Sequence, residues 1–193
     1  MTDLVVFNSV PDRRLFLSSV QKECTLAFGE LYGDLCVAAA ERIKQLPVTL
    51  RLLAENIVDE ECVSSLQRSL LSELESIALE ITYQFWSWHR ARGFKYTEFI
   101  ELIKHDTVAG AAIEKTLQRR AQRFVSNTMV ILHRIEADRQ LLRNRRLAPI
   151  GPCNNIMMGQ SDPHLGGQSV CLLSFGAQRV IYKPKSAFPG CAI

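Results

Sequence analysis

Apolar side chains recur every three or four positions through most of the chain up to Arg146, which is the spacing of one face of an α-helix. The longest stripe lies in Glu60–Arg90, where acidic residues stand at the start and basic residues at the end, as the helix macrodipole favours. Gly93 is the expected stop. The stripe consists of Val63, Leu66, Leu70, Leu74, Ile77, Ile81, Phe85 and Trp88. One long helix is predicted here.

Four further helical patterns surround this stripe. The first starts at Arg13 and runs through Val37, with Gly29 and Gly33 as expected breaks or bends, and Pro47 ends any helix that reaches Gln45. The others cover 50–58, 98–105 with Thr97 as the N-cap, and 108–146. The chain therefore begins with a helical region.

The pattern changes after residue 146. Leu147–Pro152 contains two prolines and a glycine and is predicted as a linker. A strand is expected over Asn154–Gly159, and a β-hairpin is expected from Ser169–Phe175 and Arg179–Tyr182. We expect an α+β fold that is mainly α, with a helical region at 1–148 and the first strands of a small antiparallel sheet at 149–193.

The composition fits a folded chain with a mixed surface. The 193 residues are 47% hydrophobic, and 23 basic residues against 20 acidic ones give a net charge of only +3, which does not favour a nucleic-acid partner. Six scattered cysteines without CxxC spacing predict reduced thiols. With no signal peptide or membrane span in the sequence, we expect a cytoplasmic protein. The aromatic residues of 85–96 are expected to pack between helices rather than to stack on bases.

The predicted hairpin carries candidate phosphate chemistry. Gly166-Gly167 removes two Cβ atoms from the preceding loop and frees backbone N–H groups for an anion, and Lys183 would add a positive charge at the end of the second strand. Each feature alone is common, since a glycine pair is usually a turn and a strand lysine usually a solvated edge charge. The order of loop, strand, turn, strand and lysine is that of the nucleotide-binding lobe of protein kinases, although no GxGxxG is present.

Two motifs extend this likeness. S-D-P-H-x-G-G-x-S-V, in 161–170, and Y-K-P-K-S, in 182–186, together resemble the dehydratase domain of class II lanthipeptide synthetases, the LanM-type enzymes. The helical segments Tyr96–Ile100 and Arg123–Asp138 are similar to the region that precedes this motif in the family. The resemblance covers about Tyr96–Ser186, and the helices before it are compatible with the family without matching its motifs.

The resemblance implies an ATP- and Mg²⁺-dependent enzyme of lantibiotic biosynthesis. Such a domain phosphorylates Ser and Thr of a precursor peptide and then eliminates the phosphate to give dehydroamino acids. It implies catalytic roles for Asp162, His164 and Lys183, and phosphate or nucleotide contacts for Lys183 and for Gly166, Gly167, Ser169 and Lys185. Lys185 stands where the family usually has arginine, so a bidentate contact is lost there.

The chain departs from the family after Ser186. The metal-binding carboxylates, the catalytic base and the zinc-binding cyclase domain lie downstream in the family, so the sequence offers no metal ligands. We expect a truncated gene product or one part of a split synthetase that is inactive alone, with the precursor peptide and the remainder of the synthetase as partners. The alternative is a helical protein-interaction module without catalytic activity.

Overall fold

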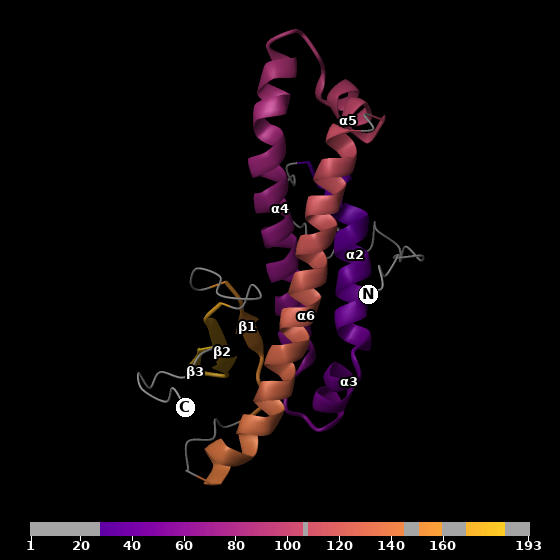
Figure 1. The fold of residues 1–193 in the computed structure, drawn as a ribbon. Helices are drawn as coiled ribbons and strands as arrows, with labels where there is room; N and C mark the ends of the chain where they lie inside the picture. Colours follow the sequence, from indigo (N-terminus) through magenta and orange to yellow (C-terminus); the bar gives the residue numbers. More distant parts are fainter. Residues whose placement is uncertain (1–27, 106–107, 145–150, 160–168, 184–193) are drawn as a thin grey trace, which may run out of the picture. The chain divides into compact units, whose positions relative to one another are not determined.

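The computed structural model describes residues 28–105, 108–144, 151–159 and 169–183, with side chains omitted for 140–144. Five helices are followed by three strands within these ranges (Figure 1). The helices are α2 (Gly29–Gln45), α3 (Pro47–Ala54), α4 (Glu60–Arg90), α5 (Tyr96–His105) and α6 (Ala109–Asn144), and the strands are β1 (Asn155–Met157), β2 (Cys171–Phe175) and β3 (Gln178–Tyr182). The predicted α+β fold, mainly α, is confirmed.

The chain forms two compact units, each built from two stretches of sequence. The first unit lies within Met1–Arg42 and Leu70–Phe124, and the second within Ile43–Ser69 and Val125–Ile193. Helices α2, α4 and α6 each contribute residues to both units. The predicted domain boundary at residue 148 remains a prediction. All three strands belong to the second unit, so the candidate site is described there.

Pro47 marks a boundary between the first two described helices, whereas Gly33 does not interrupt the helix that contains it. Helix α2 ends at Gln45 as predicted, but α3 begins at Pro47 rather than at Leu50 and ends at Ala54. The earlier start follows because a proline in the first helical turn gives up only an amide that has no partner there. Gly33 lies buried inside the continuous α2, so of the predicted break or bend at this position a break is wrong. One glycine costs about 1 kcal/mol relative to alanine, too little to end a helix with a buried face.

Helix α4 has the predicted boundaries, and both ends are capped. The Asp59 carboxylate accepts a hydrogen bond from the Cys62 amide at 2.8 Å, which is the N-cap arrangement. Glu60 stands in the first turn, and His89 and Arg90 stand in the last. Gly93 follows with φ +87°, and its amide donates to the Arg90 carbonyl. The left-handed conformation ends the helix, as expected for glycine.

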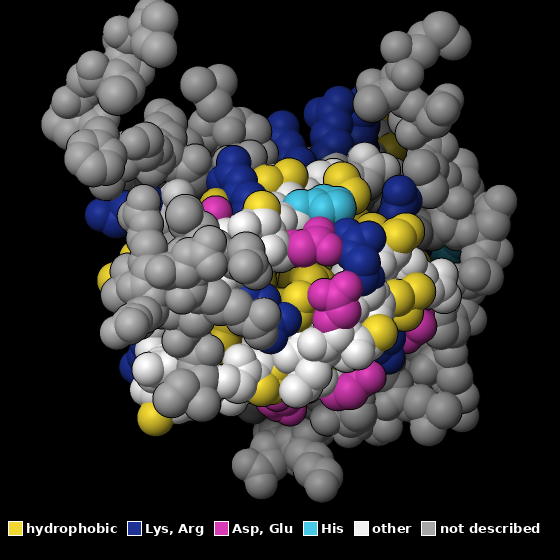
Figure 2. Space-filling model, turned by 90° about the horizontal axis from the view of Figure 1, so that it is seen from below, with side chains coloured by type: hydrophobic (Ala, Val, Ile, Leu, Met, Phe, Trp, Pro, Cys, Tyr) yellow, Lys and Arg dark blue, Asp and Glu magenta, His cyan; other side chains and the backbone are white. Residues whose placement is uncertain are grey.

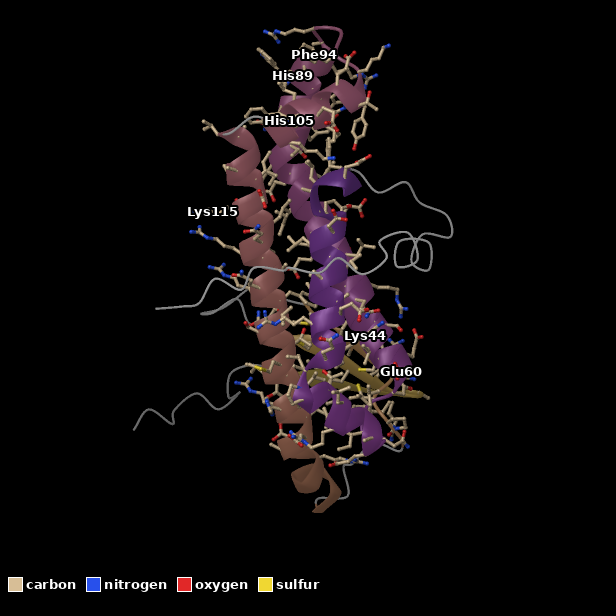
Figure 3. All side chains as sticks on the ribbon, turned by 90° about the vertical axis from the view of Figure 1, so that its right-hand side faces the viewer. Lys44, Glu60, His89, Phe94, His105 and Lys115 are labelled. Atoms are coloured by element: carbon tan, nitrogen blue, oxygen red, sulfur yellow. The ribbon has the colours of Figure 1, made fainter. Side chains whose placement is uncertain are left out.

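The apolar stripe of α4 is buried only along its earlier turns. Leu70 and Leu74 are completely buried in the first unit, whereas Phe85 and Trp88 are about half exposed, at 49% and 53%. Near the C-terminal end of α4, His89 and Phe94 lie together, with ring centroids 5.1 Å apart (Figure 3). The aromatic packing prediction holds for Trp86, which contacts the Tyr96 and Phe99 rings.

Helix α5 begins two residues earlier than an N-cap at Thr97 would allow. Its first residue is Tyr96, and the Glu98 carboxylate accepts a hydrogen bond from the Lys95 amide at 2.9 Å. The glutamate at the third helical position thus reaches back to the N-cap amide, which is half of a capping box. The predicted N-cap at Thr97 is therefore wrong. Helix α6 spans most of the predicted 108–146.

The three strands form one antiparallel sheet in the order β1-β2-β3. Within the hairpin, Phe175 pairs with Gln178, so only Gly176 and Ala177 form the loop. Gly176 has φ +61°, as a two-residue turn with glycine at its first position requires. The predicted hairpin and the preceding strand are confirmed.

Surface and core agree with the composition. Figure 2 shows basic and acidic side chains interspersed on the face that it draws, without a large field of one sign. The four described cysteines are buried and free, as predicted. Within the described ranges, no helix combines the length and the apolar character needed to cross a bilayer.

Candidate functional site

The strand pairing gives the sheet two different faces. Residues directly opposite each other in an antiparallel pair point to the same side. Ile156, Leu173 and Cys171 therefore share a face, and all three are buried. The other face carries the alternate residues and is open. We call these the core face and the open face of the sheet.

An apolar row crosses the open face. Met157 pairs with Leu172, and Leu172 pairs with Ile181, so the three side chains stand in line across β1, β2 and β3. Met157 is 41% exposed and Ile181 is 65% exposed. An exposed row of this kind offers a flat apolar surface about three strands wide.

Lys183 adjoins this row. It follows β3 directly, is exposed, and lies two residues after Ile181, so the strand alternation directs it to the open face. Arg179 occupies the same face two residues before Ile181, near the turn. The open face thus has an apolar centre with one cation at each end of the β3 segment.

Ser169 lies at the same end of the hairpin as Lys183, because Cys171 pairs with Tyr182. Its hydroxyl accepts a hydrogen bond from the Gly159 amide at 2.9 Å. Gly159 and Ser169 flank residues 160–168, so this bond ties together the two ends of the segment that contains the predicted loop. The Ser169 O–H remains able to donate a further bond.

Ser169 and Lys183 do not share a face. Ser169 lines a cavity of about 10 Å³, roughly the space of one water molecule, together with Tyr182, Asn127 and Arg134. Tyr182 points to the core face, opposite to the direction of Lys183. The structure therefore places the two predicted residues at one end of the hairpin but on opposite sides of the sheet.

Arg134 is not among the site residues predicted from the sequence. Its guanidinium lies 5.8 Å from the centre of the Tyr182 ring, a cation–π contact between α6 and the last residue of β3. This contact lies on the core face with Tyr182, and the strand alternation places Lys183 on the other face. The available signal was the position of Arg134 inside the segment Arg123–Asp138, but helical periodicity alone does not tell which arginine faces a strand.

The sheet is attached to the helices by polar contacts as well as by its core face. The Ile156 amide donates to the Ser65 hydroxyl at 3.1 Å, and Ser65 in turn donates to the Cys62 carbonyl at 2.7 Å. Cys153 forms a parallel bridge with Val58, just before α4. These contacts hold β1 against the start of α4.

Several predicted site residues lie outside the described residues. They are Asp162, His164, Gly166, Gly167 and Lys185. Their predicted roles remain predictions. Within the described ranges, no group of three His, Cys, Asp or Glu side chains gathers as a metal site would require.

Comparison with known proteins gives a family match for the C-terminal part of the chain. A search of curated proteins finds none similar to the chain. Residues 111–189 match a family described as Domain of unknown function (DUF4135), and this range includes nearly all of α6, the sheet and the two motifs of 161–170 and 182–186. The chain therefore contains a DUF4135 domain at residues 111–189.

Proposed function

We propose that the chain forms the N-terminal part of the dehydratase domain of a class II lanthipeptide synthetase. In this proposal the domain uses ATP and Mg²⁺ to phosphorylate Ser and Thr of a precursor peptide and then eliminates the phosphate. The proposal is supported by the two motifs of 161–170 and 182–186 and by the β2–β3 hairpin that separates them.

The observation that carries the proposal is the composition of the open face. A nucleotide combines an apolar, flat base with a polyanionic phosphate chain. The row of Met157, Leu172 and Ile181 would receive the base, and Lys183 would bind the phosphates as a point charge. Phosphoryl transfer depends mostly on positioning and on neutralising charge, so a lysine beside an apolar surface is the part that this chain would contribute.

The remaining predicted residues enter by resemblance. Asp162 and His164 would orient and transfer a proton near the phosphate, and Gly166 and Gly167 would let the loop approach it closely. ATP and Mg²⁺ would supply the phosphoryl group and the charge that counters it. Lys185 would add a second positive charge after Lys183.

Lys183→Ala and Arg179→Ala form a matched pair for a binding test. Both remove an exposed cation from the open face of the same strand, but from opposite ends of it. In calorimetric titration of the 193-residue chain with Mg²⁺-ATP, we expect Lys183→Ala to weaken binding by about tenfold or more, because a charge-assisted contact contributes roughly 1.5–3 kcal/mol. Arg179→Ala should bind as the wild type does.

The same titration can overturn the proposal. Equal losses in the two variants would mean nonspecific attraction, and no binding by the wild-type chain would leave Lys183 without the proposed role. Unchanged behaviour of Lys183→Ala together with concentration-dependent association in analytical ultracentrifugation would favour the second candidate, a protein-interaction module. The exposed Phe85 and Trp88 are the observation in favour of that candidate.

Incubation with ATP, Mg²⁺ and a lanthipeptide precursor provides the activity measurement. A mass gain of about 80 Da for a phosphoryl group, or a loss of about 18 Da for water, would show that this polypeptide carries out the proposed phosphorylation or dehydration by itself.

A further inference from the structure

Two buried thiols of the second unit lie in neighbouring segments, because the backbone of Cys153 pairs with residues 57–59 just before α4. Cys62 stands in the first turn of α4, and Cys153 stands in the segment before β1, and each is completely buried. The Cys62 amide is held by Asp59, whose own amide donates to the Cys153 carbonyl at 3.1 Å. The Cys153 amide donates to the Ile57 carbonyl at 2.8 Å. The backbone on both sides of the pair is therefore fixed.

The two thiols influence each other, and they differ in acidity. A side-chain hydrogen bond with Cys153, followed by burial, raises the pKa of Cys62. The same bond lowers the pKa of Cys153, against the opposing effect of burial. The Cys153 sulfur is thus the more readily ionised member of the pair, and a thiolate is the reactive form of cysteine.

We propose that Cys62 and Cys153 form a redox-sensitive pair that closes to a disulfide and locks the sheet to the start of α4. The oxidant is a peroxide, such as hydrogen peroxide. The Cys153 thiolate attacks one peroxide oxygen, the O–O bond breaks, and Cys153 becomes a sulfenic acid while hydroxide takes up a proton and leaves as water. The Cys62 sulfur then attacks the Cys153 sulfur, the S–O bond breaks, and a second water leaves. Two thiols are oxidised and one peroxide is reduced.

The cross-link joins elements that are far apart in the sequence. Because it would close a long stretch of chain between Cys62 and Cys153, oxidation should stabilise the second unit and raise the thermal midpoint by about 5–10 °C. Both thiols are buried, so their oxidation requires the segment around Cys153 to open. The pair therefore responds to oxidant only as fast as the sheet separates from α4, which couples redox state to the motion of the sheet.

The test is oxidation of the chain with hydrogen peroxide, followed by unfolding, alkylation of the remaining thiols and mapping of linked peptides by mass spectrometry. The starting variant carries Cys24→Ser and Cys191→Ser, since these cysteines lie outside the described residues. We expect a mass loss of about 2 Da before alkylation, with one linked pair of peptides containing Cys62 and Cys153 that dithiothreitol separates.

Single substitutions test the assigned order. Cys62→Ala should leave a sulfenic acid on Cys153 that dimedone traps, whereas Cys153→Ala should leave Cys62 unlabelled. Cys36→Ala is the matched control, because Cys36 is equally buried and burial raises its pKa to about 12. Its loss should not change the Cys62–Cys153 link.

Three results would overturn the proposal. One is a folded chain whose four remaining thiols stay reduced at peroxide concentrations that oxidise the urea-unfolded chain. The others are links that join Cys36 or Cys171 as often as Cys62 and Cys153, and dimedone labelling of Cys62 instead of Cys153. Circular dichroism of each variant shows whether it is folded. If the Cys62 or Cys153 variant does not fold, the linked-peptide map of the Cys36→Ala chain still tests the proposal.

Discussion

Replacing Ser65 with alanine should destabilise the second unit far more than the same change at the adjacent Ser64. Ser65 is 4% exposed, donates to the Cys62 carbonyl at 2.7 Å and accepts from the Ile156 amide at 3.1 Å. Ser64 is half-buried on the same helix. The pair of substitutions thus separates the role of the Ser65 hydroxyl from the general effect of a serine-to-alanine change in α4.

The magnitude follows from the amide that loses its partner. Ile156 is completely buried, so its N–H cannot turn to water, and an unpaired buried donor costs about 1–3 kcal/mol. Alanine recovers about 0.5 kcal/mol through its higher helix propensity. The lost bond to the Cys62 carbonyl costs little, because that carbonyl lies inside the helical ladder. The net loss should be about 1–2 kcal/mol, or a fall of about 3–6 °C in the thermal midpoint for a chain of this length.

Urea unfolding monitored by circular dichroism measures the total effect, and hydrogen exchange with mass spectrometry locates it. We expect faster exchange in peptides that contain Ile156 for Ser65→Ala and unchanged exchange for Ser64→Ala. If the two variants differ by less than about 0.5 kcal/mol, or if exchange at Ile156 is unchanged in Ser65→Ala, the hydroxyl does not hold β1 as the reasoning requires.

Two further predictions concern other parts of the chain. Gly110→Ala should lower the free energy of unfolding by about 1–3 kcal/mol although alanine favours helices, because the new Cβ would press against the Ile103 carbonyl, whose carbon would be 3.3 Å away. Urea unfolding midpoints measure the loss, and Lys115→Ala, an exposed position on α6, is the control. A Gly110→Ala chain as stable as the wild type would contradict the clash. Glu136 accepts two bonds from Arg51, at 2.5 and 2.8 Å, and these lower its pKa. Since the folded pKa lies below the unfolded value of about 4.3, this contribution is present above that value and is lost as the pH falls through the lowered pKa. The urea midpoint of Glu136→Gln should therefore fall less steeply than that of the wild type between about pH 5 and pH 3, and an equal slope would count against the pairing.

The elements that the sequence predicted well are those whose signals are local. Helix α4 carries its N-cap, its charged ends and its stop glycine within one stretch, so both boundaries follow from neighbouring residues. The predicted starts of α3 and α5 are two or three residues too late, because Pro47 and Glu98 each satisfy the first turn in a way that competes with the more familiar signal. The hairpin was predictable because alternation and Gly176 act over only a few residues.

The parts of the site that escaped prediction depend on contacts between distant residues. Nothing local to Ser65 shows that its hydroxyl meets an amide of β1, and nothing local to Arg134 shows that it faces Tyr182. Likewise, the sequence predicts that Ser169 and Lys183 lie at one end of a hairpin but not which face the helices cover. That choice depends on packing across the second unit, because it is the buried row of Cys171, Leu173 and Ile156 that selects the core face.

The register of the hairpin decides whether Lys183 is available to any ligand. With Leu172 opposite Ile181, the lysine belongs to the open face, whereas a slip of one residue would turn β3 over and direct Lys183 toward the core. Burying an unpaired ammonium there would cost several kcal/mol, which disfavours the slipped pairing. The slip would also lose the turn geometry at Gly176 and the contact of Tyr182 with Arg134. The free energy of unfolding should therefore fall in Val180→Lys, which places a charge on the core face. It should change little in Ile181→Lys, which places the charge on the open face. The proposed nucleotide contact thus depends on the same alternation that buries the core face of the sheet.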